Sequence, residues 1–306
     1  MKTAIIGLPM VGKTSLFTIL TGVHEAARVG SMETRVGVAK VPDQRLTELA
    51  KIFEPPKVTH ATVEYLDFPA ISKEALRDPS YLASLRVVDA LAHVLRTFES
   101  DSVPHEKGSV DPLRDAEDVD MELILSDLVV VEKRMERVEK DRKKQRLPEL
   151  DKEMDLLVRC KEALENNQPL RSLEFEDEDE KRIRGFQFLS LKPMLYVMNL
   201  GEEDAAKLHE VEQRYRESAL GGKANTGVTA VCGKIEAELA GMSDEEKREL
   251  LEHLTETEGF EQFLQVKFLG AKRFSLEGGE SFIASMDELV KRAGEQGVQE
   301  IVIGMA

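Results

Sequence analysis

Near the start of the chain stands the stretch Gly7-Leu8-Pro9-Met10-Val11-Gly12-Lys13-Thr14, which matches the pattern G-x-x-x-x-G-K-S/T. It follows a short β-rich run, 3–6, and leads into an apolar helix-like run, 15–20. The two glycines permit backbone angles and a close approach that a Cβ would block, so backbone N–H groups can surround phosphate oxygens. In this pattern Lys13 reaches the β- and γ-phosphates, and the Thr14 hydroxyl binds Mg²⁺. The stretch therefore predicts a site for a nucleoside triphosphate.

A second requirement of such a site is a carboxylate near Mg²⁺, at the end of a neighbouring strand. Asp67 closes the strand-like run 63–67 and suits that role. The plainer alternative is that an aspartate after a strand only forms a turn. We expect Asp67 to act together with Thr14 at the metal.

Base recognition is expected after a later strand. Asn199-Leu200-Gly201-Glu202 follows the strand-like run 193–198, at the place where nucleotide-binding GTPases carry Asn-Lys-x-Asp. Asn199 can bridge the base and the phosphate loop, whereas Leu200 lacks an ammonium and Glu202 is one methylene longer than Asp. An ordinary helix N-cap region is the alternative. Cys232-Gly233-Lys234 takes the place of a further loop whose backbone meets the base. The expected nucleotide contacts are Pro9, Met10, Val11, Gly12, Lys13, Thr14, Ser15, Asn199, Leu200, Glu202, Cys232 and Gly233.

The alternation of strand-like and helix-like runs predicts an α/β fold, a P-loop NTPase with a mostly parallel sheet and flanking helices. A helical insertion, 113–187, divides the nucleotide-binding domain into 1–112 and 188–260. Its seam follows heptad spacing, which predicts an antiparallel coiled-coil hairpin. The seam residues are Met121, Ile124, Leu128, Val131, Met135 and Val138. The two stripes can pack on each other and leave a solvated face, or the hairpin can bind a protein partner. A short C-terminal segment, 261–306, completes the chain.

Composition argues against several classes of function. The 306 residues carry a formal net charge of −16, with 42% hydrophobic and 33% charged residues. This acidic balance disfavours adhesion to DNA or to anionic membrane, although it leaves room for local basic patches. No run approaches the ~20 apolar residues that span a bilayer. Cys160 and Cys232 have neither disulfide nor metal-ligand spacing. We expect a soluble cytoplasmic protein.

Together these motifs resemble the YchF subfamily of the Obg-like GTPases, translation-factor-related P-loop proteins known for preferring ATP. The resemblance runs in order from residue 1 to about 260 and includes a helical insertion at the position of the family's coiled-coil domain. The matching stretches are the phosphate loop, Val41-Pro42-Asp43-Gln44-Arg45-Leu46, Val63-Glu64-Tyr65-Leu66-Asp67, Asp89-Ala90-Leu91-Ala92-His93-Val94-Leu95-Arg96, Leu191-Lys192-Pro193-Met194-Leu195-Tyr196-Val197 and Lys234-Ile235-Glu236-Ala237-Glu238-Leu239.

The resemblance implies an ATPase or GTPase that uses Mg²⁺, with Asn199 and Glu202 at the base and Asp67 at the metal. It implies Ser31 as a further Mg²⁺ ligand, in place of the switch-one threonine. Family members lack the usual catalytic glutamine and carry an apolar residue there, which in this chain is Ile71. A loop histidine has been proposed as the substitute, and the matching residue is His105.

Four departures from the family bear on hydrolysis. The glycine of the Asp-x-x-Gly motif is Ala70, which tolerates fewer backbone angles. The glycine-rich stretch that follows it in relatives is missing. The phosphate-loop asparagine, a potential ligand for a monovalent cation, is Met10. The segment 261–306 stands where relatives carry a TGS domain and does not match it well.

Three functions follow from these observations. The first is slow Mg²⁺-dependent hydrolysis of a nucleoside triphosphate, ATP preferred over GTP, in a regulatory switch that uses Lys13 and His105 for catalysis. The second is a catalytically degenerate scaffold that binds nucleotide and works through its helical hairpin. The third, a ribosome-associated GTP-binding factor, rests on the family resemblance alone.

Overall fold

The computed structural model describes residues 1–23, 34–71, 75, 78–100, 103–145, 147–243, 245–252, 286 and 289–292. The chain forms two compact units, Met1–Ala237 and Glu238–Ala306. Most of the expected C-terminal segment, 261–306, lies outside the described residues, so the fold below is that of the first unit. In the second unit, residues 245–252 are helical, and the Ser243 and Glu246 side chains each accept a hydrogen bond from the other residue's backbone N–H.

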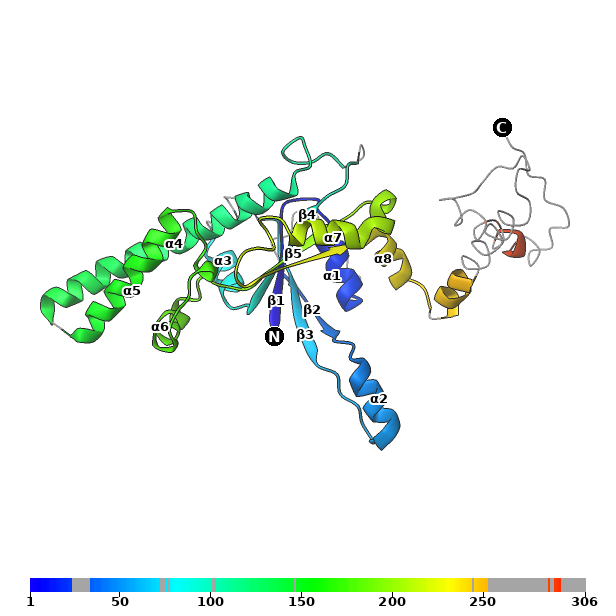
Figure 1. The fold of residues 1–306 in the computed structure, drawn as a ribbon, viewed down its shortest axis with the longest axis horizontal. Coiled ribbons are helices and arrows are strands. Elements are labelled where there is room, and N and C mark those ends of the chain that lie inside the picture. Colours follow the sequence, from blue (N-terminus) through cyan, green and yellow to red (C-terminus); the bar gives the residue numbers. More distant parts are fainter. Residues whose placement is uncertain are drawn as a thin grey trace. The chain divides into compact units, whose positions relative to one another are not determined.

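One six-stranded sheet forms the centre of the first unit (Figure 1). Its order is β2-β3-β1-β4-β5-β6, and only β2 runs antiparallel to its neighbour. The strands are β1 (Lys2–Ile6), β2 (Arg35–Lys40), β3 (Thr62–Asp67), β4 (Ala90–Arg96), β5 (Met194–Asn199) and β6 (Thr226–Val231). The predicted α/β fold with a mostly parallel sheet is confirmed. Because five strands are parallel, their carboxyl ends meet at one edge, where ligands bind in such sheets.

The helices α1 (Lys13–Thr21), α3 (Pro79–Arg86) and α7 (Leu208–Arg216) pack against this sheet, and their apolar side chains join its core. The helix α2 (Gln44–Phe53) has no buried residue, and α8 (Gly233–Ala240) buries only Gly233. The core is apolar and continuous, and it includes Ile5, Phe17, Leu85, Leu91 and Met198. β1 and β4 are buried on both faces, so they are mainly apolar and do not alternate with polar residues, although Thr3, His93 and Arg96 are buried among the apolar side chains. After β5 the chain forms a 3-10 segment, η4 (Glu202–Lys207), before α7 begins.

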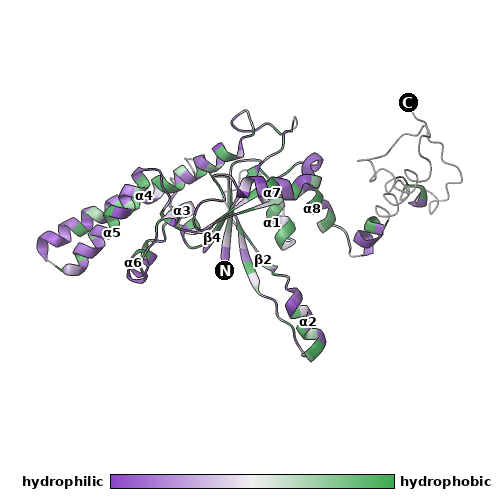
Figure 2. Ribbon diagram, viewed as in Figure 1, coloured by the Kyte–Doolittle hydropathy of each residue, from purple (hydrophilic) through white to green (hydrophobic). Residues whose placement is uncertain are grey.

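A long helical hairpin lies between β4 and β5 in the chain. It consists of α4 (Pro112–Lys144) and α5 (Pro148–Glu165), and its outer end is mainly hydrophilic (Figure 2). Ile124, Val131 and Val138 of the expected heptad seam are buried, and Leu128 and Met135 pack against them. The chain returns to the sheet through η2 (Leu170–Ser172), α6 (Asp177–Ile183) and η3 (Arg184–Phe186). The two helical stripes thus share a core of their own.

Buried polar contacts attach this hairpin to the sheet. Asp127 of α4 is fully buried and accepts hydrogen bonds from the backbone N–H groups of Leu189 and Ser190, at 3.0 and 2.7 Å. Earlier on α4, Asp120 pairs with Arg171 and accepts a hydrogen bond from the Tyr196 hydroxyl of β5, at 3.0 Å. Since a buried carboxylate is costly unless paired, these contacts fix the orientation of α4 against the sheet.

Among the residues that the structure describes, no helix combines the length and the apolar character that crossing a bilayer requires.

Candidate nucleotide-binding site

The phosphate loop connects the carboxyl end of β1 to the N-terminus of α1. Gly7 and Gly12 have φ angles of 146° and 99°. A Cβ on Gly7 would lie 2.6 Å from the Val94 carbonyl oxygen, and one on Gly12 would lie 2.4 Å from Asn199 Nδ2. Both positions therefore require glycine for their conformation and for their neighbours. No described side chain caps α1, so its first backbone N–H groups are available to an anion.

Lys13 lies inside the loop. Its side chain is only 8% exposed, and Nζ donates a hydrogen bond to the Leu8 carbonyl oxygen at 2.6 Å. Burial lowers the pKa of Lys13 to about 8, against the opposing effect of the Asp67 and Glu106 carboxylates. The loop thus holds an ammonium that donates to one backbone carbonyl. A phosphate oxygen can replace that carbonyl as the acceptor.

Thr14 and Asp67 lie together at the predicted metal position. The Thr14 hydroxyl donates a hydrogen bond to Asp67 Oδ2 at 2.9 Å, and Asp67 Oδ1 is buried with no hydrogen-bond partner among the described residues. Hydroxyl and carboxylate oxygens are the ligands that Mg²⁺ prefers, with phosphate and water completing its shell. These two residues therefore fit a Mg²⁺ ion. Ser31, the third expected ligand, lies outside the described residues.

Asn199 joins two loops of the site. Its Nδ2 donates to the Val11 carbonyl oxygen of the phosphate loop at 2.9 Å, and its Oδ1 accepts from the Gly233 N–H at 3.0 Å. A Cβ on Gly233 would lie 2.9 Å from Asn199 Oδ1, so this approach also needs glycine. The predicted phosphate loop and the predicted base loop are thus brought together by one amide.

The remaining residues predicted to meet the base belong to the two loops that follow β5 and β6. Leu200 and Cys232 are buried. Glu202 pairs with Lys234, with 2.5 Å between its Oε2 and the lysine Nζ. On the other side, a Cβ on Gly201 would lie 3.1 Å from Cβ of Phe98, so the Phe98 side chain lies against this loop. These residues offer a planar base an apolar wall and an exposed ion pair.

Met10 is an unusual residue for its position in the phosphate loop. Its side chain is 66% exposed and its φ is 58°, in the left-handed region that asparagine tolerates and methionine rarely adopts. The neighbouring contacts expected from sequence, Pro9 and Ser15, are exposed on either side of the loop.

His105 is held by a carboxylate. Its side chain is 4% exposed, with Nε2 at 2.9 Å from Asp115 Oδ2, while Nδ1 accepts a hydrogen bond from the Lys107 N–H at 3.2 Å. Because Nδ1 is an acceptor, we assign a ring proton to Nε2, which lies beside Asp115 Oδ2 without the geometry of a hydrogen bond. Nδ1 is therefore hydrogen-bonded within the chain, whereas Nε2 is only close to a carboxylate. The adjacent Glu106 lies near enough to influence the pKa of Lys13.

Three residues of this region have no counterpart among the sequence predictions. Arg35 pairs with Asp67, Asp115 lies beside His105, and the Glu106 carboxylate acts on the pKa of Lys13. The pairing register of β2 with β3 would have revealed Arg35, since the two residues are direct partners across the strands. We find no sequence signal for Asp115 or Glu106.

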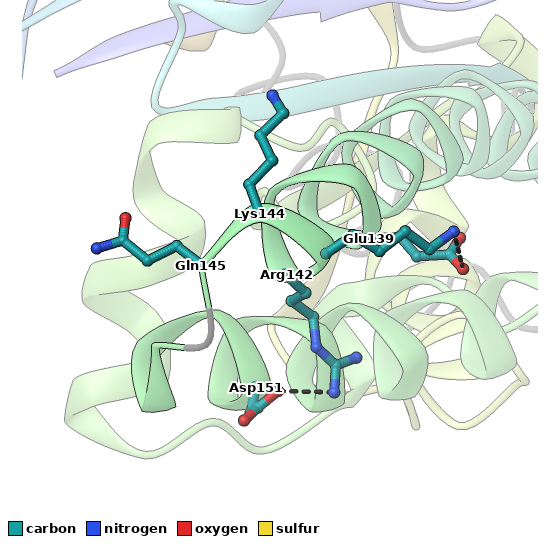
Figure 3. Close-up of a pocket in the computed structure, with 6 residues that line it drawn as sticks. Glu139, Arg142, Lys144, Gln145 and Asp151 are labelled. Carbon is teal, nitrogen blue, oxygen red and sulfur yellow. Dashed lines mark ion pairs between the residues drawn. The ribbon is translucent and has the colours of Figure 1, made fainter.

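A separate hollow lies at the outer end of the hairpin, far along the chain from this site. Glu139, Arg142, Lys143, Lys144, Gln145 and Asp151 line it (Figure 3). Arg142 pairs with Asp151 across the two helices at 2.6 Å. The lining is polar and charged, which suits a surface contact better than a buried small molecule.

Comparisons with known proteins agree with this geometry. The chain is 37% identical over 278 residues to the ribosome-binding ATPase YchF of Bacillus subtilis, covering 88% of this chain and 75% of that protein. It is 36% identical over 260 residues to the protein of the same name from Haemophilus influenzae, covering 83% and 70%. The YchF GTPase structure from Schizosaccharomyces pombe matches in fold, with a TM-score of 0.65 and 24% identity, covering 80% of this chain and 69% of that one. No protein-family model matches the chain.

The lowered pKa of Lys13 predicts a pH-dependent contribution to stability. Below a pH of about 8 the native and unfolded states are both protonated, so folding carries the full cost of burying the ammonium. Between about 8 and 10.5 the native state loses the proton first, and the free energy of unfolding rises with pH. Relative to Lys13→Met, we expect wild type to gain about 3 kcal/mol across this window. Denaturant unfolding of both proteins measures it, and a difference that is constant with pH would contradict the burial of this charge.

Proposed function

The chain belongs to the YchF family of Obg-like P-loop proteins, and from that premise we propose that it is a slow ATPase acting as a regulatory switch. Its substrates are ATP and water, and its products are ADP and phosphate. The names of the relatives, an ATPase and a GTPase, agree with a nucleotide ligand.

The observation that best supports this proposal is the position of Asn199. One amide contacts the carbonyl of Val11 and the N–H of Gly233, so the phosphate loop and the base loop are fixed at one spacing. Such preorganisation matters because a nucleotide must meet both loops at once. A chance match to the phosphate-loop pattern would not bring the second loop to it.

The chemistry is an in-line transfer of the γ-phosphoryl group to water. The N–H groups of the loop and the Lys13 ammonium stabilise charge on the phosphate oxygens. Mg²⁺, held by Thr14 and Asp67, would neutralise further charge on the β- and γ-phosphates when bound. At the position of a catalytic glutamine stands Ile71, which is buried and apolar and cannot orient water. Turnover is therefore expected to be slow.

The ion pair between Glu202 and Lys234 favours ATP over GTP in this proposal. A guanine base needs a carboxylate that accepts from its N1–H and its amino group together. In this chain the Glu202 carboxylate is already paired with an ammonium, and that pair would have to open. Adenine makes no such demand on Glu202.

One observation favours the alternative of a catalytically inactive scaffold. The Ile71 N–H donates to the Gly7 carbonyl oxygen at 3.1 Å, so the segment after Asp67 is bonded directly to the phosphate loop. Its preceding residue is Ala70, which tolerates fewer backbone angles than the family's glycine. A segment fixed in this way would respond little to the loss of the γ-phosphate.

Calorimetry and single-turnover assays with Mg²⁺ separate these functions. We expect ATP to bind more tightly than GTP, and Asn199→Ala to weaken ATP binding roughly 10- to 100-fold because two buried hydrogen bonds are removed. Asn166→Ala, at the exposed end of α5, is the matched control. If ATP raises the melting temperature but no phosphate is released over hours, the scaffold is the correct function. Tighter binding of GTP would contradict our interpretation of Glu202.

We propose further that His105 positions the attacking water once its contact with Asp115 opens. Replacing it with alanine should slow single-turnover hydrolysis by about 100-fold, the usual range for a positioned acid–base group. Binding of ATP should be unchanged. Asp115→Asn keeps a polar partner for the ring and serves as a second variant. An unaltered rate in His105→Ala would leave the histidine with a structural role alone.

A ribosome partner is supported by the charge at the hairpin's outer end. Residues 133–146 contain eight basic and three acidic residues, within a chain whose net charge is −16. Lys143 and Lys144 have exposed side chains, and the hollow of Figure 3 lies among them. The two relatives are named as ribosome-binding proteins. We propose that this end of the hairpin contacts the phosphates of ribosomal RNA, which would place the protein in the cytoplasm.

Cosedimentation with ribosomes at several salt concentrations tests this interaction. Replacing Lys140, Lys143 and Lys144 with Gln should weaken ribosome binding. The slope of the logarithm of the binding constant against the logarithm of the salt concentration should fall by about one for each phosphate that the protein no longer neutralises. A control with Lys51, Lys57 and Lys207 replaced by Gln changes the net charge equally at other exposed sites. Equal effects of the two triple variants would contradict an RNA-binding role for the hairpin.

A further inference from the structure

Arg35 lies at the predicted metal position because of the sheet register. It is the first residue of β2, and its direct partner across the antiparallel pair is Asp67, the last residue of β3. Side chains of directly opposed residues lie on the same face of a sheet, about 5 Å apart at Cβ. The backbone alone therefore brings an arginine beside the carboxylate that Thr14 also contacts.

The side chain of Arg35 contacts both Asp67 and Phe17. Its guanidinium pairs closely with Asp67 Oδ2, the same oxygen that accepts from the Thr14 hydroxyl. Its Cζ lies 5.2 Å from the centre of the Phe17 ring, and the side chain is only 16% exposed. An arginine held against an aromatic ring and a buried carboxylate is a strong, well-oriented ion pair.

This ion pair and a Mg²⁺ ion would compete for one carboxylate. Asp67 Oδ2 is shared between Arg35 and Thr14, and a metal bound to Thr14 would lie beside the same oxygen. The guanidinium and the metal ion are both positive, and they would repel strongly if they contacted one carboxylate in a part-buried site. We therefore expect only one of them to be the close partner of Asp67.

We propose that Arg35 is the internal counter-ion of Asp67 in the metal-free protein and that Mg²⁺ must displace it. Arg35 then keeps the carboxylate oriented before the metal arrives, and it lowers the affinity for Mg²⁺. Because Arg35 begins β2, its release also links metal binding to the start of that strand. This inference rests on the proposed function for the identity of the metal.

The test compares wild type with Arg35→Gln, with Arg35→Lys as a second variant that keeps a charge without the planar guanidinium. Calorimetric titration of MgCl₂ into the ADP-bound protein should give roughly tenfold tighter binding for Arg35→Gln and an intermediate value for Arg35→Lys. Without metal, Arg35→Gln should melt at a lower temperature, since Asp67 loses its partner. Lys40→Gln, at the other end of β2, removes the same charge and should match wild type.

Two results would overturn the proposal. Unchanged or weaker Mg²⁺ affinity in Arg35→Gln would show that the arginine does not compete with the metal. Unchanged affinity with a large loss of single-turnover rate would instead assign Arg35 to the transition state. Failure of the proposed function is seen separately, as an absence of nucleotide binding by wild type. In that case MgCl₂ alone is titrated against thermal unfolding, and stabilisation must begin at a lower concentration in Arg35→Gln for the inference to stand.

Discussion

The side-chain amide of Asn199 is the contact on which the site depends. It spans 188 residues of chain to reach Val11 and a further 34 to reach Gly233. Parallel pairing of β1, β4, β5 and β6 makes this possible, since their carboxyl ends meet at one edge. Gly12 and Gly233 provide the space, because a Cβ on either would collide with the amide. The donor and acceptor of a single residue thus set the distance between two loops, and the glycines are required because of it.

The helical hairpin is inserted between β4 and β5, and these two strands still pair side by side in the sheet. Its two helices share an apolar core of their own, while Ala116, Val119 and Leu123 at the start of α4 belong to the core of the sheet. Polar contacts of Asp127, and of Asp120 with Arg171, further fix how the hairpin is oriented. The charge of Arg171 and the Tyr196 hydroxyl hold the pKa of Asp120 below its usual value although burial acts to raise it. Since Tyr196 belongs to β5, the strand that ends at Asn199, one element carries both the hairpin's attachment and the base loop.

Much of this could be predicted from sequence because local signals were strong. The phosphate loop, Asp67 at a strand end and the heptad seam each depend on residues close together in the chain. Pairings between distant elements could not be predicted. Arg35 meets Asp67 only through the register of β2, and His105 meets Asp115 only because the loop folds back on the first turn of α4.

Three groups expected to act on the nucleotide lie against other groups of the chain. Lys13 donates to the Leu8 carbonyl, Asp67 pairs with Arg35, and His105 contacts Asp115. The hydrogen bond of Lys13 and the ion pair of Asp67 offset part of the cost of burying these charges. Binding of a metal–nucleotide complex is then an exchange of partners, in which only the difference between old and new contacts contributes to affinity. For His105 the new partner would be a single water molecule, a weaker replacement for a carboxylate. Slow hydrolysis is the expected consequence of that last, least favourable exchange.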